Sequence, residues 1–568
     1  MSMRSAIRTF MLAATAVAAA VVCTAAFAQG DVAHTRHNLA PSGPGTVRAT
    51  ESSGVCVYCH TPHNANPTRG LWNRQLPAVT YRVYSSTTTK ARITQPTGSS
   101  RLCLSCHDGV LALGNLRASP RRSGAGLGLL RGPSVIGTDL SDDHPISFVY
   151  DSALAAHGGL ADPASLPSTV PLDDTRQMQC TTCHDAHEAR RPRFLRMEER
   201  GGGLCITCHR ISGWSASIHA TSPATWNGVG SSPWPAQAFA TVAENGCLSC
   251  HRPHAAGHGE RLLAQPTESG NCLVCHAGNV ASRNVENEFL KPFRHPIDSA
   301  QWVHDPAENP AVAPRHVACV DCHNPHASTS TSGSAPILPG SLKGVPGMAL
   351  GGSLVAEATF EYEVCFKCHG AREPVTPGMV RQGGTRNIRL RIDPGNRSYH
   401  PVAAAGKNPS VGSLKPQYNA SSLISCTSCH NSDDWTPAGR SPRGPHGSRF
   451  EPILGREYLT NDPIPESPQA YDLCYQCHNR DFLLGDRAGT FPHRLHVVDR
   501  QAPCAVCHDP HGSRDGEHLV DFMTRDRTGK PVVTPSVAQR RLEYTAPGGG
   551  HGQCYLQCHG VNHEPKSY

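Results

Sequence analysis

The sequence predicts a fold of mostly irregular coil with short helices and few short strands, arranged around a core that aliphatic side chains do not supply. Three observations predict this fold class. Only 38% of the 568 residues are hydrophobic, which is little for a chain of this length. The 47 prolines and 53 glycines occur throughout, so long regular elements are not expected. The chain also carries 25 cysteines and 33 histidines, which disordered segments rarely do.

The first 28 residues have the features of a signal peptide. Arg4 and Arg8 precede an apolar run, and Ala26 to Ala28 offer small residues for cleavage before Gln29. After this segment, no apolar stretch is long enough to cross a bilayer. We therefore expect an exported protein without a transmembrane anchor, located in the periplasm, at the outer cell surface or outside the cell.

The 24 cysteines after this segment form twelve pairs, each followed directly by a histidine. Eleven pairs have the spacing C-x-x-C-H, which is typical of c-type haem attachment. The twelfth has one extra residue between its cysteines. The motifs comprise Cys56, Cys59 and His60; Cys103, Cys106 and His107; Cys180, Cys183 and His184; Cys205, Cys208 and His209; Cys247, Cys250 and His251; Cys272, Cys275 and His276; Cys319, Cys322 and His323; Cys365, Cys368 and His369; Cys426, Cys429 and His430; Cys474, Cys477 and His478; Cys504, Cys507 and His508; and Cys554, Cys558 and His559.

Haem attachment explains this spacing better than the alternatives. Two thiols on one short helical turn can add to the two vinyl groups of a porphyrin, and the next residue then presents its imidazole to the iron as proximal ligand. Disulfides suit an exported chain but do not require a histidine after every second cysteine. Zinc sites use cysteine pairs with histidines at varied offsets. The sequence therefore predicts about twelve covalently bound haems c, with the twelfth site set apart by its spacing.

The attachment sites alternate between two kinds, which predicts an internal repeat. Most odd-numbered sites continue for three residues to a further histidine, which we call the tail histidine, whereas even-numbered sites lack it. At the ninth site, an insertion separates His430 from a segment holding His446, which looks like the same element displaced. We expect a multihaem cytochrome c fold of six two-haem modules, with boundaries 29–135, 136–215, 216–285, 286–390, 391–490 and 491–568.

A second imidazole for each iron comes from two sets of histidines. The tail set is His63, His187, His254, His326, His446 and His511, and the set upstream of each first site is His37, His144, His219, His295, His400 and His496. Together they supply one distal ligand per haem. The alternatives left open are His493, which competes with His496, and the reserves His304, His316, His551 and His563. Methionine is not expected as a ligand, because no methionine has a repeated position.

Three residues span at most about 10 Å, so a tail histidine cannot easily reach the far face of its own haem. We therefore expect each to ligate the iron of a different haem, which would bring two macrocycles close together. Histidine on both faces leaves no open position at the iron and lacks the methionine that raises the reduction potential. Both features favour electron transfer over catalysis, so no catalytic residue and no enzymatic activity are expected.

The formal net charge of +7 does not indicate nucleic-acid binding, because the basic residues are scattered. Each ferric haem adds two propionates against one positive centre, so twelve haems would add a charge of roughly −12. Much of the positive charge of the protein would then balance the negative charge of the haem propionates. Short strands are expected at 79–83 and 388–392, short helices at 237–245 and 280–290, and a surface loop over 328–353.

The segments Cys56-Val-Tyr-Cys-His-Thr-Pro-His63, Leu102-Cys-Leu-Ser-Cys-His-Asp-Gly109 and Cys319-Val-Asp-Cys-His-Asn-Pro-His326 resemble the doubled-CXXCH multihaem cytochromes. The resemblance covers essentially residues 29–568. It implies bis-histidine haems, export and electron transfer in anaerobic respiration, often towards extracellular metal oxides. Implied partners are other cytochromes, inner-membrane quinol-oxidising systems, an outer-membrane conduit or further copies of the chain. A multihaem oxidoreductase with one open-site haem and a subunit of an extracellular cytochrome filament stay open as alternatives.

Overall fold

The computed structural model describes residues 31–51, 54–67, 70–118, 124–234, 239–297, 303–305, 308–373, 378–409, 411–485, 491–548 and 551–568. The predicted signal peptide lies outside the described residues. The chain divides into two compact units. The first extends to Ile211 and includes Glu244–Pro266, and the second comprises Ser212–Ala243 and Thr267–Tyr568.

Helices are short, as expected for a chain rich in proline and glycine. The longest described helix, α2, has ten residues. The helical segments of the first unit are η1 Val32–His34, η2 Val55–Tyr58, α2 Gly98–His107, α3 Ser152–Gly158, η4 Pro163–Ser165, α4 Cys180–Cys183, η5 Pro192–Phe194, η6 Arg200–Gly202, α5 Gly203–Cys208, η8 Gly246–Ser249 and η9 Glu260–Leu262, and α7 Val242–Asn245 spans the boundary.

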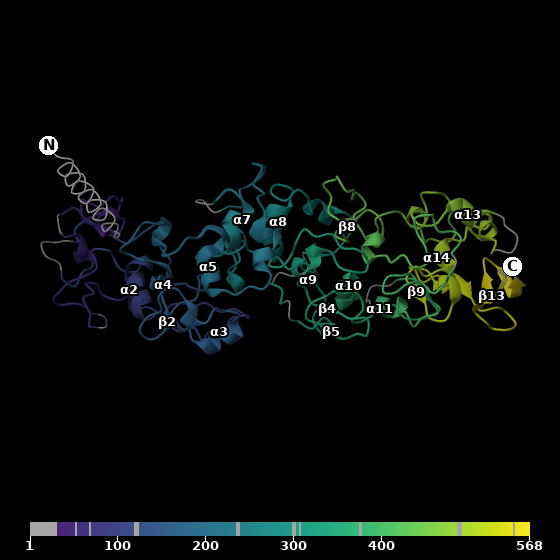
Figure 1. The fold of residues 1–568 in the computed structure, drawn as a ribbon, viewed down its shortest axis with the longest axis horizontal. Helices are drawn as coiled ribbons and strands as arrows, with labels where there is room; N and C mark the ends of the chain where they lie inside the picture. Colours follow the sequence, from purple (N-terminus) through teal and green to yellow (C-terminus); the bar gives the residue numbers. More distant parts are fainter. Residues whose placement is uncertain are drawn as a thin grey trace, which may run out of the picture. The chain divides into compact units, whose positions relative to one another are not determined.

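The second unit has the same character, and most of its chain is coil (Figure 1). Its helical segments are η7 Trp214–Ala216, α6 Ile218–Thr221, α8 Glu268–His276, η10 Glu286–Leu290, α9 Cys319–Cys322, η12 Gly340–Leu342, α10 Glu361–His369, α11 Ile388–Arg391, η13 Cys426–Ser428, α12 Asp472–Tyr475, α13 Arg480–Leu484, η14 Leu495–Asp499, α14 Cys504–Cys507 and η15 Glu517–Leu519.

Most strands are two-residue antiparallel ladders that join segments far apart in the sequence. The ladders are β1 Phe148–Val149 with β2 Gln177–Met178, β3 Phe293–Arg294 with β8 Gly447–Ser448, β4 Gly347–Met348 with β5 Leu354–Val355, β6 Val380–Arg381 with β10 Met523–Arg525, and β7 Ser398–Tyr399 with β9 Gly512–Ser513. Two of them fix histidines side by side. Ladder β3–β8 sets His295 beside His446, and β7–β9 sets His400 beside His511.

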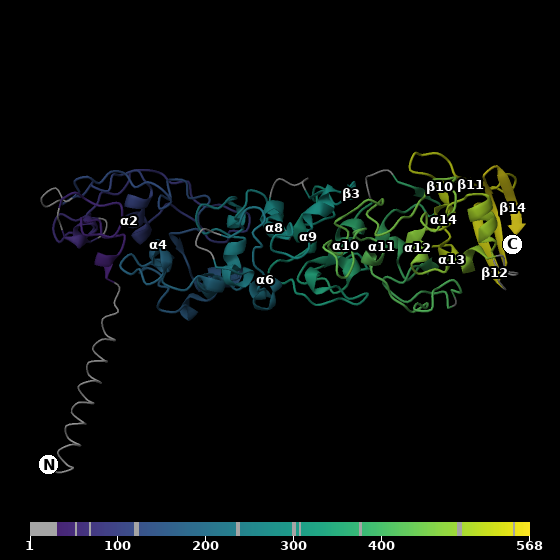
Figure 2. The same cartoon turned by 90° about the horizontal axis from the view of Figure 1, so that it is seen from above.

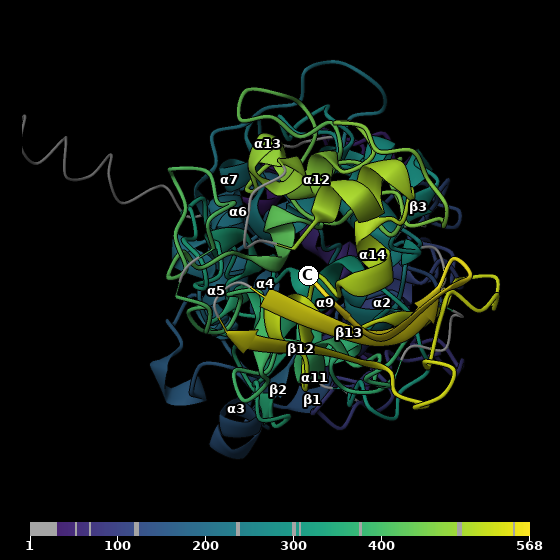
Figure 3. The ribbon, with the colours of Figure 1, turned by 90° about the vertical axis from the view of Figure 1, so that its right-hand side faces the viewer.

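The C-terminal region differs, because it forms a larger antiparallel sheet (Figures 2 and 3). Strands β11 Val533–Thr534, β12 Glu543–Gly548 and β14 Val561–Ser567 all pair with β13 His551–Cys558. One side of the sheet packs on a cluster that includes Val506, Phe522 and Met523. This cluster has six buried residues, whereas the other apolar clusters of the described residues have three to five.

Two expected strands are wrong. The segment from Ile388 forms helix α11, because Ile388 and Ile392 lie one turn apart and both pack beside Phe366, while Leu390 is exposed. Residues 79–83 form only an isolated bridge between Arg82 and Asp139. The expected helix over 280–290 is limited to η10. None of the helices in the described ranges has the length and apolarity needed to span a membrane.

Candidate haem sites

Eleven of the twelve cysteine pairs lie on helical turns. In the odd-numbered sites, the histidine amide donates to the carbonyl of the first cysteine, as between His60 and Cys56 at 2.8 Å and between His323 and Cys319 at 3.0 Å. One such turn places both thiols on the same side, with side chains about 5–6 Å apart. Among the described residues no cysteine forms a disulfide. The local geometry that one porphyrin needs is therefore present at these eleven sites.

The odd sites and three of the even sites differ in how the chain leaves the turn, whereas the even site on α5 Gly203–Cys208 leaves it extended at His209, as the odd sites do. Odd sites are single turns, such as α4, after which His184 is already extended at φ −116° and ψ 145°. Three even sites instead end longer helices, namely α2, α8 and α10, in which the histidine is the last helical residue. The extended exit lets odd sites continue directly to their tail histidines.

The residue after the odd-site histidine fixes the tail. The side chains of Asp185, Asn324 and Asp509 accept hydrogen bonds from the amides of the tail histidines two residues later, at 3.0–3.1 Å. These short Asx turns orient the tail before any ligand binds. This role was not predicted from the sequence, although an Asp or Asn directly after the histidine of several attachment motifs could have indicated it.

Each tail histidine that has a partner within its own unit faces an odd-site histidine of another motif, and the ring planes are closer to parallel than to perpendicular. The pairs are His60 with His187 at 6.2 Å between ring centroids and 14° between planes, His184 with His254 at 6.2 Å and 36°, His323 with His446 at 6.1 Å and 6°, and His430 with His511 at 6.3 Å and 12°. The last odd site follows the same pattern with a different partner, because His508 faces His493 at 6.4 Å and 19°.

Upstream histidines face even-site histidines at the same distance but with crossed planes. These pairs are His37 with His107 at 6.2 Å and 87°, His144 with His209 at 6.2 Å and 81°, His219 with His276 at 6.2 Å and 66°, and His295 with His369 at 6.3 Å and 52°. The two sets do not overlap in angle. The described residues therefore contain two geometrically distinct kinds of imidazole pair.

The Nδ1 atoms of these rings are held by hydrogen bonds. In the upstream set, Nδ1 of His37 and of His219 lies 3.0 Å from the carbonyl of the residue just before a tail histidine. Proximal rings use nearby carbonyls, as His107 does with Ser134 at 2.7 Å and His184 with Arg193 at 2.8 Å. An Nδ1–H that donates to a carbonyl leaves Nε2 with a lone pair, the arrangement found around metal-bound histidines.

Burial keeps many of these imidazoles neutral. It lowers the pKa of His144, His276, His430, His478 and His508 to about 4 each, and that of His446 to about 3. Neighbouring histidines lower the pKa further in each case. Only the neutral ring can donate an electron pair to a metal, so at neutral pH these side chains are in the form that a ligand requires.

Thiols of successive sites contact one another. The Cys103 thiol of an even site hydrogen-bonds Cys180 of the next odd site, and Cys365 does the same with Cys426. The first cysteines of the fourth and fifth sites, and of the sixth and seventh, are linked in the same way. Each contact joins two different attachment sites, so groups held on these sulfurs would have neighbouring edges.

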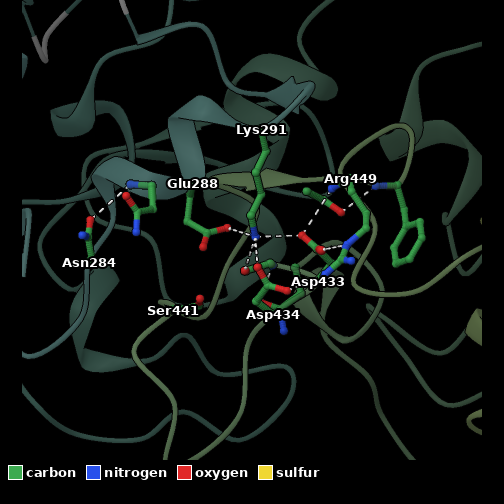
Figure 4. Close-up of polar contacts among 12 residues, drawn as sticks. Asn284, Glu288, Lys291, Asp433, Asp434, Ser441 and Arg449 are labelled. Carbon is green, nitrogen blue, oxygen red and sulfur yellow. Dashed lines mark hydrogen bonds and ion pairs between the residues drawn. The ribbon is translucent and has the colours of Figure 1, made fainter.

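The insertion at the ninth site is stabilised by a partly buried ion network around Lys291 (Figure 4). The Lys291 ammonium lies 2.8 Å from Glu288, 2.8 Å from Asp433 and 3.0 Å from Asp434, and Arg449 pairs with both aspartates. These carboxylates raise the pKa of Lys291 against the opposing effect of desolvation. The network fixes both ends of the inserted loop, and the displaced His446 comes to face His323.

The twelfth pair lies on a strand instead of a turn. Cys554 and Cys558 both belong to β13, opposite Tyr544 and Val533 of the neighbouring strands. Four residues of strand span about 13 Å, more than twice the separation on a helical turn. Nε2 of His559 is 2.8 Å from a carboxylate oxygen of Asp462. The residues of this site do not fit one haem in this conformation.

The other histidines expected as distal ligands, or held as alternatives, form none of these imidazole pairs within one unit. His63 is exposed and is not opposed by another imidazole in the described part of the first unit. His400 lowers the pKa of the buried His478, so the two lie close together. Nε2 of His496 lies 3.3 Å from the Tyr568 hydroxyl, which also contacts His563.

His251 and His326 belong to different units, and each is described by its own contacts. Nδ1 of His251 contacts the carbonyl of Arg261, and the ring of His326 contacts Trp214. The side chain of His551 lies outside the described residues.

The paired imidazoles fit a haem iron. An imidazole nitrogen lies about 1.1 Å from its ring centroid, so two rings bound to one metal at about 2.0 Å per bond have centroids about 6.2 Å apart. The observed separations are 6.1–6.4 Å. Two thiols that can bind the vinyl groups and two imidazoles that can bind the iron are the protein groups that a bis-histidine c-type haem requires. The nine pairs described above therefore match the group that the motifs imply.

Comparison with known proteins agrees with this chemistry. The family of the doubled CXXCH motif matches residues 174–211 and 240–281. The chain is also 28% identical over 138 residues to the multiheme cytochrome MtrA of Shewanella baltica (strain OS185), a match that covers 24% of this chain and 28% of that protein. The two findings support a relationship between this chain and the doubled-CXXCH multihaem cytochromes, with haem c as the group that such motifs bind.

Proposed function

We propose that this chain is an exported electron conduit whose eleven turn-held sites carry c-type haems, each with histidine on both faces of its iron. The observation that carries the proposal is the set of paired imidazoles with ring centroids 6.1–6.4 Å apart, nine pairs of which lie within single units. Eleven attachment sites are supported by turn geometry. The twelfth, at Cys554 and Cys558, requires the strand to refold locally.

In this proposal the distal ligands are those that face each proximal histidine. His37, His144, His219 and His295 serve even sites, and His400 beside His478 belongs with them. His187, His254, His446 and His511 serve the odd site of the preceding module. His493 takes the place of a tail histidine at the Cys504 site. His63, His326 and His496 stay candidates by sequence position alone.

Two properties follow from this ligand set. An iron with imidazoles on both sides has no vacant position for a small substrate, and without a methionine ligand its potential is low. Each of the four thiol contacts supports electron transfer between one even site and the odd site that follows it, because groups attached to touching sulfurs lie edge to edge. The chain then relays electrons and does not transform a substrate.

We propose further that the protein works in anaerobic respiration, in the periplasm or at the outer cell surface, and delivers electrons to acceptors such as extracellular metal oxides. The N-terminal segment supports export. Its partners would be other redox proteins: a quinol-oxidising system as donor, and an outer-membrane conduit or further copies of the chain as acceptor. The family of the similar cytochrome MtrA supports a redox-protein setting.

The experiment that tests the proposal compares two tail histidines at the same motif position. His187 faces His60, whereas His63 faces no imidazole in the described part of its unit. In the reduced wild-type holoprotein, carbon monoxide should leave the spectrum of the eleven turn-held haems unchanged. His187→Ala should open one iron and give carbon monoxide binding at one haem per chain, while His63→Ala should match the wild type.

The outcomes separate the assignment from the fold. Carbon monoxide binding in His63→Ala equal to that in His187→Ala would contradict the ligand assignment. Binding at many haems of the wild-type protein would contradict the conduit itself. The haem content per chain, measured on each variant, shows that attachment is intact, because neither residue belongs to an attachment motif.

One observation favours a second candidate, a multihaem oxidoreductase. A haem attached at the C-terminal site would meet His559, but Nε2 of the expected distal ligand His496 already contacts Tyr568. Such a haem would have an open position. Carbon monoxide binding to a single haem of the wild-type protein, lost in Cys554→Ser/Cys558→Ser, would support this candidate.

A further inference from the structure

A cluster of metal-binding side chains lies apart from the imidazole pairs, just before the Cys319 attachment turn. His304, Glu308, His316 and Asp321 each offer one ligand atom, and these four atoms lie within 4.8 Å of one another. The side chains of His304 and His316 are only 1% and 3% exposed. Their ring centroids are 5.0 Å apart, too close to hold a haem iron between them. These two reserve ligands of the sequence analysis therefore do not form a haem pair.

Two ring nitrogens of this cluster lie against one another. Nδ1 of His316 lies 2.8 Å from the carbonyl of Pro314, which only accepts, so this nitrogen carries the hydrogen of a neutral ring and Nε2 of His316 has a lone pair. That Nε2 lies 2.8 Å from His304 Nδ1. The other nitrogen of His304, Nε2, lies 3.3 Å from Asp321 Oδ1. With the hydrogen of His304 on Nε2, toward this carboxylate, Nδ1 also offers a lone pair, and the two facing nitrogens can share one metal ion.

Ligand spacing favours a metal ion. Besides the two nitrogens, Glu308 Oε1 lies 3.3 Å from His316 Nε2 and 3.9 Å from His304 Nδ1. A tetrahedral ion with bonds of about 2.0–2.2 Å holds its ligand atoms about 3.3–3.6 Å apart. The three observed separations bracket that value, so small shifts of the three side chains would admit one ion.

The surrounding groups have the character of an outer coordination shell. Asp321 binds the rear nitrogen of His304, and its other oxygen accepts the amide of Ala318 at 2.7 Å. A carboxylate behind a histidine fixes the ligating tautomer and makes the ring a stronger donor. Lys367 lies 3.3 Å from the same aspartate, and Glu268 accepts the His304 amide at 2.8 Å. Three carboxylates against one ammonium leave a negative site, which a divalent cation would compensate.

We propose that His304, His316 and Glu308 bind one divalent transition-metal ion of the zinc class, with Asp321 as the residue that orients His304. Two imidazoles and one carboxylate are ligands that zinc accepts readily, and water completes the tetrahedron. Asp321 also lies between Cys319 and Cys322 of the seventh attachment motif, so this ion would be bound next to a haem-attachment turn. The site is independent of the haem ligands.

The test uses the haem-loaded protein, stripped of loosely bound metal with a chelator and then given zinc chloride. We expect one zinc ion per chain by elemental analysis after gel filtration. Zinc-edge X-ray absorption, to which the haem irons do not contribute, should show two imidazole nitrogens. His316→Gln should weaken zinc binding by about 100-fold, and Glu308→Gln by about tenfold. His157→Gln, which changes an exposed histidine of α3, is the matched control and should bind zinc as the wild type does.

Other outcomes would overturn the proposal. If the gap between the rings holds only a proton, the wild-type protein will retain no zinc. If zinc binds elsewhere on the surface, His316→Gln will retain as much as the wild type, and the absorption spectrum will lack the two-imidazole signature. An unchanged haem content and c-type spectrum in each variant shows that loss of zinc does not reflect loss of the fold.

Discussion

The attachment sites on helical turns and the site on the C-terminal sheet differ in the separation of their two cysteines. A helical turn holds two cysteine side chains about 5–6 Å apart, whereas β13 spreads Cys554 and Cys558 over about 13 Å. The surroundings differ too, because most turns lie beside opposed imidazoles while the sheet packs on Val506, Phe522 and Met523. A cysteine-pair motif therefore predicts attachment only together with its local conformation.

The largest expected effect is on the number of haems per chain, which tests whether cysteine pairs on turns bind haem and the pair on β13 does not. We expect the intact mass of the purified protein to correspond to eleven haems. Cys554→Ser/Cys558→Ser should leave that number unchanged, whereas Cys504→Ser/Cys507→Ser should remove one. A twelfth haem in the wild-type protein, lost in the first variant, would show that the C-terminal strand refolds into a turn during maturation.

A smaller effect would sharpen the comparison by dividing the turn-held sites into two classes. Nearly parallel imidazoles split the iron orbitals that hold the unpaired electron, while crossed imidazoles leave them close in energy. The oxidised protein should therefore show both a rhombic low-spin EPR signal and a strongly anisotropic one. His187→Ala should remove intensity from the first, and His37→Ala from the second. A single signal type for all haems would contradict the two pair geometries.

The smallest effect concerns the thiol contact between neighbouring turns. Gly202 has φ +79°, and a Cβ there would lie 2.5 Å from the Cys247 sulfur. Gly202→Ala should cost about 1–2 kcal/mol for the backbone and about 1–3 kcal/mol more for the crowding. Gly228→Ala is the control, since Gly228 has φ +85° with no atom nearby and should cost the backbone part alone. Thermal unfolding measures the difference, and equal melting temperatures would argue against close packing of these sites.

The sequence predicted well what depends on local spacing. Cysteine pairs one turn apart and the mostly irregular fold are visible in composition and motif, and the structure has the coil, short helices and few strands expected. The opposed histidines were harder to assign, because His446 reaches His323 only through the fold of an insertion held by Lys291. Nor did the sequence indicate that His493 would face His508, or that Nε2 of His496 would lie beside the hydroxyl of Tyr568, 72 positions later in the chain. The six modules stay a prediction.

The strand expected at Ile388 shows another limit of pattern reading. Alternating apolar residues suit a strand, but Ile388 and Ile392 also lie on one face of a helix, and packing against Phe366 decided between them. The buried cluster around His304 was equally invisible, since its members are separated by irregular chain. Tertiary contacts, which no local pattern encodes, settled both cases.

The hydrogen bonds of the upstream histidines set an order of assembly. His37 and His219 rely on carbonyls that lie 149 and 106 positions later in the chain. With the proposed ligation, a polypeptide emerging from its N-terminus would hold half-finished centres until the following repeat arrives. Each such haem would then gain its second histidine only after the following repeat has been synthesised. A truncated chain would therefore end in a haem whose iron lacks a distal histidine and binds carbon monoxide.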